Sequence, residues 1–124
     1  MLIIEDQVIF LTRGDNASLQ IDLTTDAGEA WTLSEDDALT LALRALPTAD
    51  APVLMRVPGA PGSDTIPIRP EDTAGLEVGQ YSADIQLITG AGQVLTVWPR
   101  LEGRNRTKVR NYKNFIIMSE VNIP

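Results

Sequence analysis

The chain contains neither cysteine nor histidine among its 124 residues. Disulfide frameworks, thiolate zinc sites, cysteine nucleophiles and histidine-based catalytic triads all need one of these residues, so each is excluded. Glycine-rich phosphate loops of the Walker or dinucleotide type are missing as well. Carboxylate chemistry, as in glycoside hydrolysis or oxygen-ligated metal sites, stays available. Because no motif specifies a reaction, we expect a protein that is not an enzyme and that uses no cofactor or metal.

Long apolar runs are also missing, since no stretch approaches the roughly 20 residues that span a bilayer. The first ten residues, MLIIEDQVIF, have no basic start and reach Glu5 and Asp6 early, unlike a signal peptide. We therefore expect synthesis in the cytoplasm and no membrane insertion. With 44% hydrophobic and 22% charged residues, residues 1–124 are predicted to form a single globular domain.

Positive charge is scarce except in one segment. Residues 1–99 carry 4 basic and 15 acidic side chains, a net charge of −11, whereas residues 100–113 (RLEGRNRTKVRNYK) carry 6 basic and 1 acidic, a net charge of +5. The overall net charge of −7 opposes binding to nucleic acid. This layout suits head-to-tail docking of an acidic face onto the basic segment of another copy or of a partner. A solvated loop with no partner is the other interpretation. The candidate docking residues are Arg100, Arg104, Arg106, Lys108, Arg110 and Lys113.

Alternation of apolar and polar residues predicts several short strands. In ASLQIDLTT the apolar positions are Leu19, Ile21 and Leu23, and in QYSADIQLIT they are Tyr81, Ala83, Ile85 and Leu87. Glycines at 90–92 predict a hairpin loop into QVLTVWPRL, which Pro99 ends or marks as an edge. VLMRV, IPIR and NFIIMSEV are further short strands. Such spacing with little helix predicts an all-β chain, folded as an antiparallel β-sandwich.

Residues 35–46 allow two interpretations. LSEDDALTLALRAL can form a helix capped by Ser34, because alanine and leucine favour helices. It can also form a strand with Leu39, Leu41 and Leu43 facing inward and Arg44 outward. The strands predicted on both sides favour the strand.

The stretch EDTAGLEVGQYSADIQL (71–87) concentrates acidic residues, which we interpret as structural. Pro70 starts a helical turn near residues 70–76, and Asp72 or Thr73 can accept a backbone N–H there. Leu76 can enter the core, and Gly79 releases the chain into the next strand. Tyr81 then faces the core and Asp84 lies on the polar face. Catalysis by Asp72 and Asp84 would need a cleft that joins them.

Two further features are weak functional signals. Arg13-Gly14-Asp15 spells a cell-adhesion tripeptide, but Gly14 and Asp15 more simply form a turn between two strands. Trp31 and Trp98 are interpreted as core or interface anchors, with a platform for sugar stacking as the alternative.

A family pattern is present in FLTRGDNASLQIDLTTDAGEAWTLS and in IPIRPEDTAGLEVGQYSADIQLITGAGQVLTVWP. These stretches resemble the N-terminal domains of phage baseplate upper proteins and related small phage or prophage tail proteins, most specifically over residues 66–97. The resemblance implies an Ig-like β-sandwich that acts as a structural or assembly module in a phage tail or baseplate. Ser82-Ala83 departs from it, because a more aromatic residue is expected beside the tyrosine.

The sequence therefore predicts a non-enzymatic virion protein that contacts other virion proteins or copies of itself and forms a homo-oligomer. It would be made in the host cytoplasm and end in the virion tail, with no nucleic acid or membrane as partner. A carbohydrate- or other ligand-binding sandwich module is the alternative.

Overall fold

The computed structural model describes residues 2–5, 8–23, 28–46, 50–98 and 114–119. These residues form nine strands and one short helix, in the order β1 (Leu2–Glu5), β2 (Val8–Thr12), β3 (Ala17–Gln20), β4 (Ala38–Arg44), β5 (Val53–Pro58), β6 (Thr65–Ile68), α1 (Pro70–Ala74), β7 (Gly79–Ile88), β8 (Val94–Trp98) and β9 (Phe115–Met118). The predicted all-β class and the helical turn near residues 70–76 are confirmed. β1 lies in a stretch for which the sequence predicted no strand.

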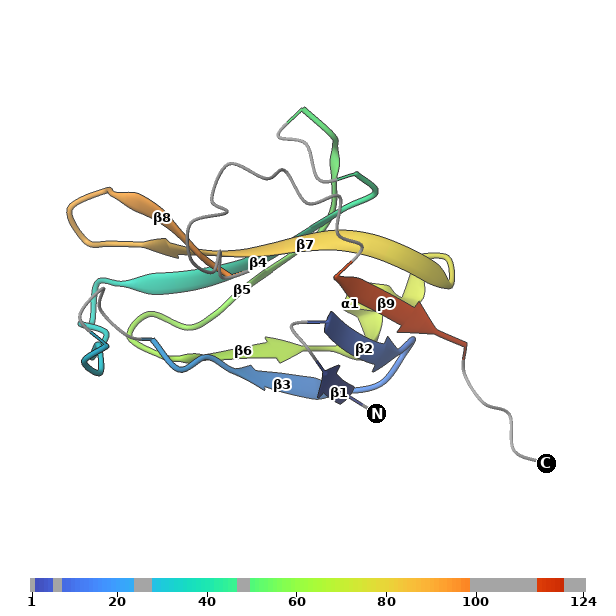
Figure 1. Cartoon of the computed structure of the whole chain (residues 1–124), viewed down its shortest axis with the longest axis horizontal. Coiled ribbons are helices and arrows are strands. Elements are labelled where there is room, and N and C mark those ends of the chain that lie inside the picture. Colours follow the sequence, from blue (N-terminus) through green and yellow to red (C-terminus); the bar gives the residue numbers. More distant parts are fainter. Residues whose placement is uncertain (1, 6–7, 24–27, 47–49, 99–113, 120–124) are drawn as a thin grey trace.

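The strands form two layers (Figure 1). The larger sheet has the order β1-β2-β9-β7-β4-β5, and β8 also pairs with β7. The smaller sheet consists of β3 and β6, which run beneath β4 and β7. All pairs are antiparallel except β2–β9, which is parallel, so the large sheet is mixed rather than purely antiparallel.

The strand order agrees with that of a variable-type Ig sandwich. In such domains one sheet runs G-F-C-C′ and the other contains B next to E. Here β9-β7-β4-β5 follows the first order and β3–β6 the second, in the same order along the chain. β7 is thus the central strand F, with β4 on one edge and β8 and β9 on the other.

The core lies between the layers and follows the alternation read from the sequence. Leu39, Leu41 and Leu43 are fully buried, so residues 38–44 are a strand and the helix alternative is wrong. β7 likewise buries all four predicted residues, Tyr81, Ala83, Ile85 and Leu87. β3 is shorter than predicted, but Ile21 and Leu23 beyond it still pack against the core.

The helical turn α1 joins β6 to β7 and has the predicted cap. Pro70 occupies its first turn, and the Asp72 carboxylate accepts the Arg69 N–H at 2.8 Å. This bond satisfies one of the donors that a helix start leaves unpaired. Leu76 is half-buried and packs against the core, as predicted.

Candidate docking surfaces around the basic segment

The two strands that flank the basic segment in sequence pair with the same edge of β7. β8 pairs with Ile85–Ile88 and β9 with Gly79–Tyr81, both on the edge opposite β4. Residues 99–113 connect these two strands, which together occupy the position of a single strand G. The candidate docking residues Arg100, Arg104, Arg106, Lys108, Arg110 and Lys113 lie outside the described residues, but the residues that hold both ends of the segment are described.

Asn114 holds the C-terminal end of the segment. Its side chain is 4% exposed and makes two hydrogen bonds with the backbone of Ala83, which lies between the β8 and β9 pairings. The Oδ1 atom accepts the Ala83 N–H at 2.6 Å, and Nδ2 donates to the Ala83 carbonyl at 2.9 Å. The Asn114 carbonyl also accepts the Ile9 N–H of β2 at 2.8 Å. The amide group thus replaces a strand residue opposite Ala83 and links β7 to β2.

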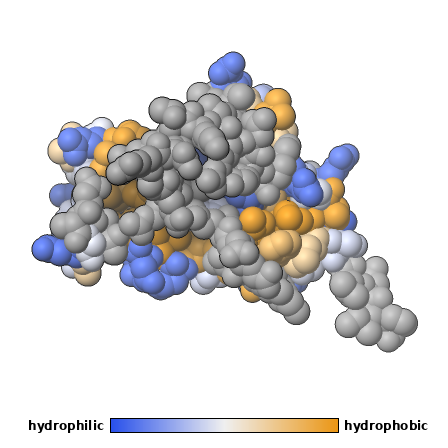
Figure 2. All heavy atoms as spheres, in the orientation of Figure 1, coloured by the Kyte–Doolittle hydropathy of each residue, from blue (hydrophilic) through white to orange (hydrophobic). Residues whose placement is uncertain are grey.

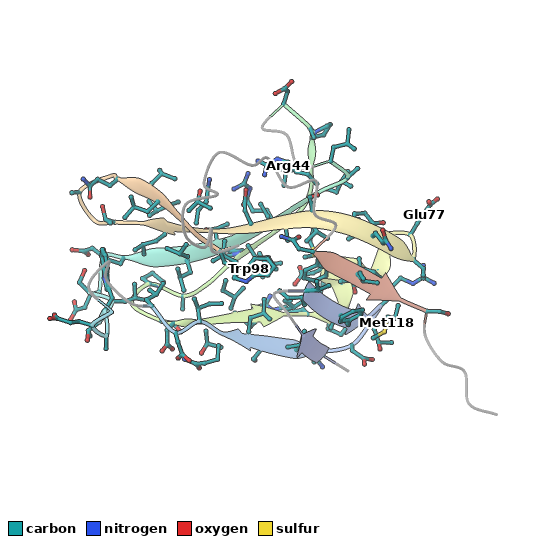
Figure 3. The ribbon with its side chains drawn as sticks, in the orientation of Figure 1. Arg44, Glu77, Trp98 and Met118 are labelled. Carbon is teal, nitrogen blue, oxygen red and sulfur yellow. The ribbon has the colours of Figure 1, made fainter. Side chains whose placement is uncertain are left out.

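Trp98 holds the N-terminal end. Its side chain is half-buried and packs against the core, and Figure 3 places it between the two layers. This agrees with the interpretation of Trp98 as a core anchor. Trp31, by contrast, is 38% exposed.

Exposed acidic residues gather at the end of the sandwich where β4 begins. They are far apart in sequence, and backbone hydrogen bonds join their loops: the Ile21 N–H donates to the Asp64 carbonyl at 2.8 Å, and the Gly62 N–H to the Asp37 carbonyl at 2.7 Å. The exposed acids of this acidic end are Asp22, Glu35, Asp36 and Asp64. The four arginines of the described residues lie elsewhere, on β4, on β5 and beside the two ends of the α1 segment. The acidic end is therefore a region of negative potential.

The buried side chain of Asp37 links two loops of the acidic end by hydrogen bonds. It is 8% exposed, and its carboxylate accepts the Ser34 N–H at 3.0 Å and the Gly90 N–H at 3.1 Å. These two backbone hydrogen bonds, first that of Ser34, hold the pKa of Asp37 below its usual value, against the opposing effect of burial. The contact with Gly90 fastens the β7–β8 hairpin to the loop before β4.

The residues predicted as a structural motif, except Asp84, assemble at the end of the sandwich opposite the acidic end. The buried Thr73 hydroxyl accepts the Gly14 N–H at 2.9 Å, and the Arg13 guanidinium donates to the Leu76 carbonyl at 3.2 Å. The Asp15 N–H closes the turn on Thr12 at 3.2 Å. Arg13, Gly14 and Asp15 thus form the predicted turn, held against the α1 segment.

Tyr81 and Asp84 share β7 but have separate surroundings. The Tyr81 hydroxyl donates to the Glu77 carbonyl at 2.6 Å, near the start of β7, and Figure 3 shows Glu77 at that end of the molecule. A tyrosine at the start of strand F bonded to the backbone just upstream is the tyrosine corner of Ig-like sandwiches. Asp84 lies on the outer face and pairs with Arg44 at 3.1 Å. Asp72 instead caps α1, so each of these two carboxylates is engaged in a structural contact of its own.

Sequence reasoning gave no anchoring role to Asn114 or Asp37. Asn114 was only the first residue of the predicted strand NFIIMSEV, and Asp37 entered only as the residue three positions after Ser34 in the helix alternative. Ser34-x-x-Asp37 does carry a recognisable signal, because a short polar side chain often bonds a backbone N–H three residues away.

Within the described residues, no group of three or more acidic side chains could hold a metal ion. The same residues contain no helix that is long and apolar enough to cross a membrane. No family model matches the chain, and no curated protein or solved structure matches it.

Proposed function

We propose that this chain is a non-enzymatic structural protein of a phage or prophage virion, associated with the tail or baseplate, that acts through protein–protein contacts. The observation that carries the proposal is the position of the basic segment. Residues 99–113 connect β8 to β9, which pair with the same edge of β7, while the exposed acids Asp22, Glu35, Asp36 and Asp64 gather at one end of the fold.

The insertion point supports a docking role. The residues at both ends of the segment, Trp98 and Asn114, are fixed to the same edge of β7. Ordering the segment when a partner binds therefore costs less conformational entropy than ordering a free tail of equal length. Its net charge of +5 complements the acidic end, where Glu35, Asp36 and Asp64 are exposed. Opposite charges on two surfaces steer association and select the partner.

The sequence resemblance supports the virion context. Its most specific part, residues 66–97, runs from β6 through α1 and β7 into β8, and these elements form the tyrosine corner and the hairpin before the segment. A sandwich of this kind offers free sheet edges that neighbouring subunits can use. We accordingly place the protein in the host cytoplasm during synthesis and in the virion tail afterwards, with copies of itself or other virion proteins as partners.

The test is a charge reversal of the segment. A triple variant with Arg104→Glu, Arg106→Glu and Arg110→Glu is expected to lower the assembled mass measured by light scattering and to leave the circular dichroism spectrum unchanged. A matched variant with Arg104→Lys, Arg106→Lys and Arg110→Lys keeps the charge and should assemble as the parent does. Unchanged assembly of the reversal variant would remove the segment from the proposal.

A second candidate function is a ligand-binding sandwich module for carbohydrate. The observation in its favour is the 38% exposure of Trp31, since exposed aromatic rings can stack on sugars. A glycan panel read by tryptophan fluorescence tests it. A response that disappears in Trp31→Ala would support this candidate, and no response from any glycan would eliminate it.

A further inference from the structure

β8 exposes apolar side chains on both faces of one strand. Val94 is 57% exposed and its neighbour Leu95 is 39% exposed, although successive residues of a strand face opposite sides. Ile88, which pairs with Val94 across the hairpin, is 40% exposed. Figure 2 shows hydrophobic residues at the surface where Figure 1 places this hairpin. The two-stranded β3–β6 layer is too narrow to cover β8.

β8 also carries free main-chain hydrogen-bonding groups. The hairpin closes with a hydrogen bond from the Thr89 N–H to the Gln93 carbonyl at 2.9 Å. From there, hydrogen-bonded and non-hydrogen-bonded pairs alternate along an antiparallel ladder. In the observed register, Val94 and Thr96 fall on the pairs that are not hydrogen-bonded to β7. Their N–H and C=O groups therefore point to the outer edge of β8, where no strand pairs within the described parts of the chain.

The sheet edge formed by β5 differs from the β8 edge in its sequence. β5 contains the exposed Arg56 and Pro58, and its register against β4 shifts at Leu43/Arg44. Charge, proline and irregularity are the devices that prevent edge-to-edge pairing. The β8 sequence, VLTVW, contains no charged residue and no proline or glycine. β8 thus lacks the charge and the proline that protect β5, and its own register shift lies at its far end, between the Gln86 and Ile85 pairings.

We propose that β8 pairs with β8 of a second copy of this chain, antiparallel and about a two-fold axis near Leu95. Leu95 would then lie opposite the partner's Leu95, and Val94 opposite the partner's Thr96, so that the outward N–H and C=O groups of both residues are paired. Such an isologous contact uses one surface twice and closes as a dimer. The two large sheets would join into one continuous sheet across the axis.

Charge complementarity favours a second copy of this chain, rather than a strand of a different protein, as the partner of β8. Antiparallel pairing brings the Trp98 end of one β8 beside the partner's hairpin. That hairpin is fastened to the acidic end, because Gly90 lies against Asp36 and bonds Asp37. Arg100 follows Trp98 by two residues, a reach of about 7 Å at most. In this pairing Trp98, the last described residue before the segment of net charge +5, lies beside the other copy's acidic end, so the head-to-tail charge complement expected from the sequence can form in both directions.

The pairing is expected to be weak and dependent on concentration. One short strand and a few apolar side chains bury less surface than the 1,200–2,000 Å² of a standard interface, so we expect a dissociation constant above about 1 μM. The electrostatic part of this inference rests on the proposed function, whereas the strand pairing is independent of it.

The experiment is sedimentation equilibrium of the parent protein and Thr96→Pro, from about 10 μM to about 1 mM. The parent should approach twice 13.5 kDa with rising concentration. Thr96→Pro removes only an outward N–H, so it should keep the β7–β8 pairing and stay at 13.5 kDa. A parent that stays at the monomer mass at every concentration, or a folded Thr96→Pro that dimerises as well as the parent, would overturn the proposal.

Arg56→Pro is the matched control on the other edge. The Gly59 N–H donates to the Leu39 carbonyl at 2.7 Å, and the same alternation turns the Arg56 N–H outward. This variant should dimerise as the parent does.

If Thr96→Pro does not fold, amide hydrogen exchange of the parent decides: the Thr96 N–H should be protected at high concentration only, and equal exchange at all concentrations would overturn the pairing. Loss of assembly in the arginine reversal but not in Thr96→Pro would reject the strand pairing and leave the proposed function standing.

Discussion

Asn114 is expected to contribute more to stability than any exposed polar residue of this fold. Replacing it with alanine leaves the N–H and C=O of Ala83 without the bonds of 2.6 and 2.9 Å that now satisfy them. The position is 4% exposed, so water replaces these bonds poorly. An unpaired buried backbone group costs about 1–3 kcal/mol, so the loss of both bonds gives about 2–6 kcal/mol for Asn114→Ala. Domains of this size are stable by only about 5–15 kcal/mol.

Urea unfolding followed by tryptophan fluorescence measures this loss as a shift of the transition midpoint. Asn16→Ala, at an exposed asparagine, is the control and should change stability by no more than about 0.5 kcal/mol. A loss below about 0.5 kcal/mol in Asn114→Ala would refute the reasoning, because it would mean that the Ala83 groups find other partners.

Asn114→Asp separates the two hydrogen bonds. It keeps an acceptor for the Ala83 N–H but places a carboxylate oxygen against the Ala83 carbonyl. The folded protein should therefore raise the pKa of the introduced carboxyl, since only the protonated form can donate. Relative to the parent, the variant should be most stable below the unfolded pKa of about 3.9 and should lose stability as the pH rises through the folded pKa of the introduced carboxyl. A pH profile parallel to that of the parent would contradict this sign.

Two further predictions concern the ends of the sandwich. Tyr81→Phe removes the 2.6 Å hydrogen bond to the Glu77 carbonyl and should cost about 0.5–1.5 kcal/mol in urea unfolding, whereas an unchanged midpoint would argue against a stabilising corner. Asp37 has a lowered pKa in the folded protein, so its contribution is present above the unfolded pKa of about 3.9 and is lost as the pH falls through the lower folded value. Asp37→Asn should flatten the acid side of the stability profile, and a profile as steep as that of the parent would be the contrary result.

The strands could be predicted from the sequence because the alternation of apolar and polar residues follows directly from which side chains are buried. Leu39, Leu41 and Leu43 face the core together only in a strand, and this burial outweighs the helix propensity of the alanines and leucines around them. The α1 turn was readable for another reason: Pro70 and Asp72 satisfy local rules that do not depend on the rest of the fold.

The surfaces proposed for assembly were less visible in the sequence. VLTVW and FIIM are separated by residues 99–113, and only the pairing of both with β7 shows that they share one edge. The acids at positions 22, 35, 36 and 64 form one end only after the loops have closed. Asn114 acts as a strand residue through its side chain, which no periodicity of the backbone can reveal. Which residues share a surface therefore depends on long-range strand pairing, and the local sequence pattern does not determine that pairing.

The central claim, that this protein is a subunit that assembles through complementary charge, is tested most directly by its mass in solution. Light scattering would be recorded at low salt and at about 0.5 M salt, where screening is short-ranged. The account predicts a defined oligomer at low salt that loosens toward 13.5 kDa at high salt. A mass of 13.5 kDa under both conditions, at concentrations up to about 1 mM, would contradict it.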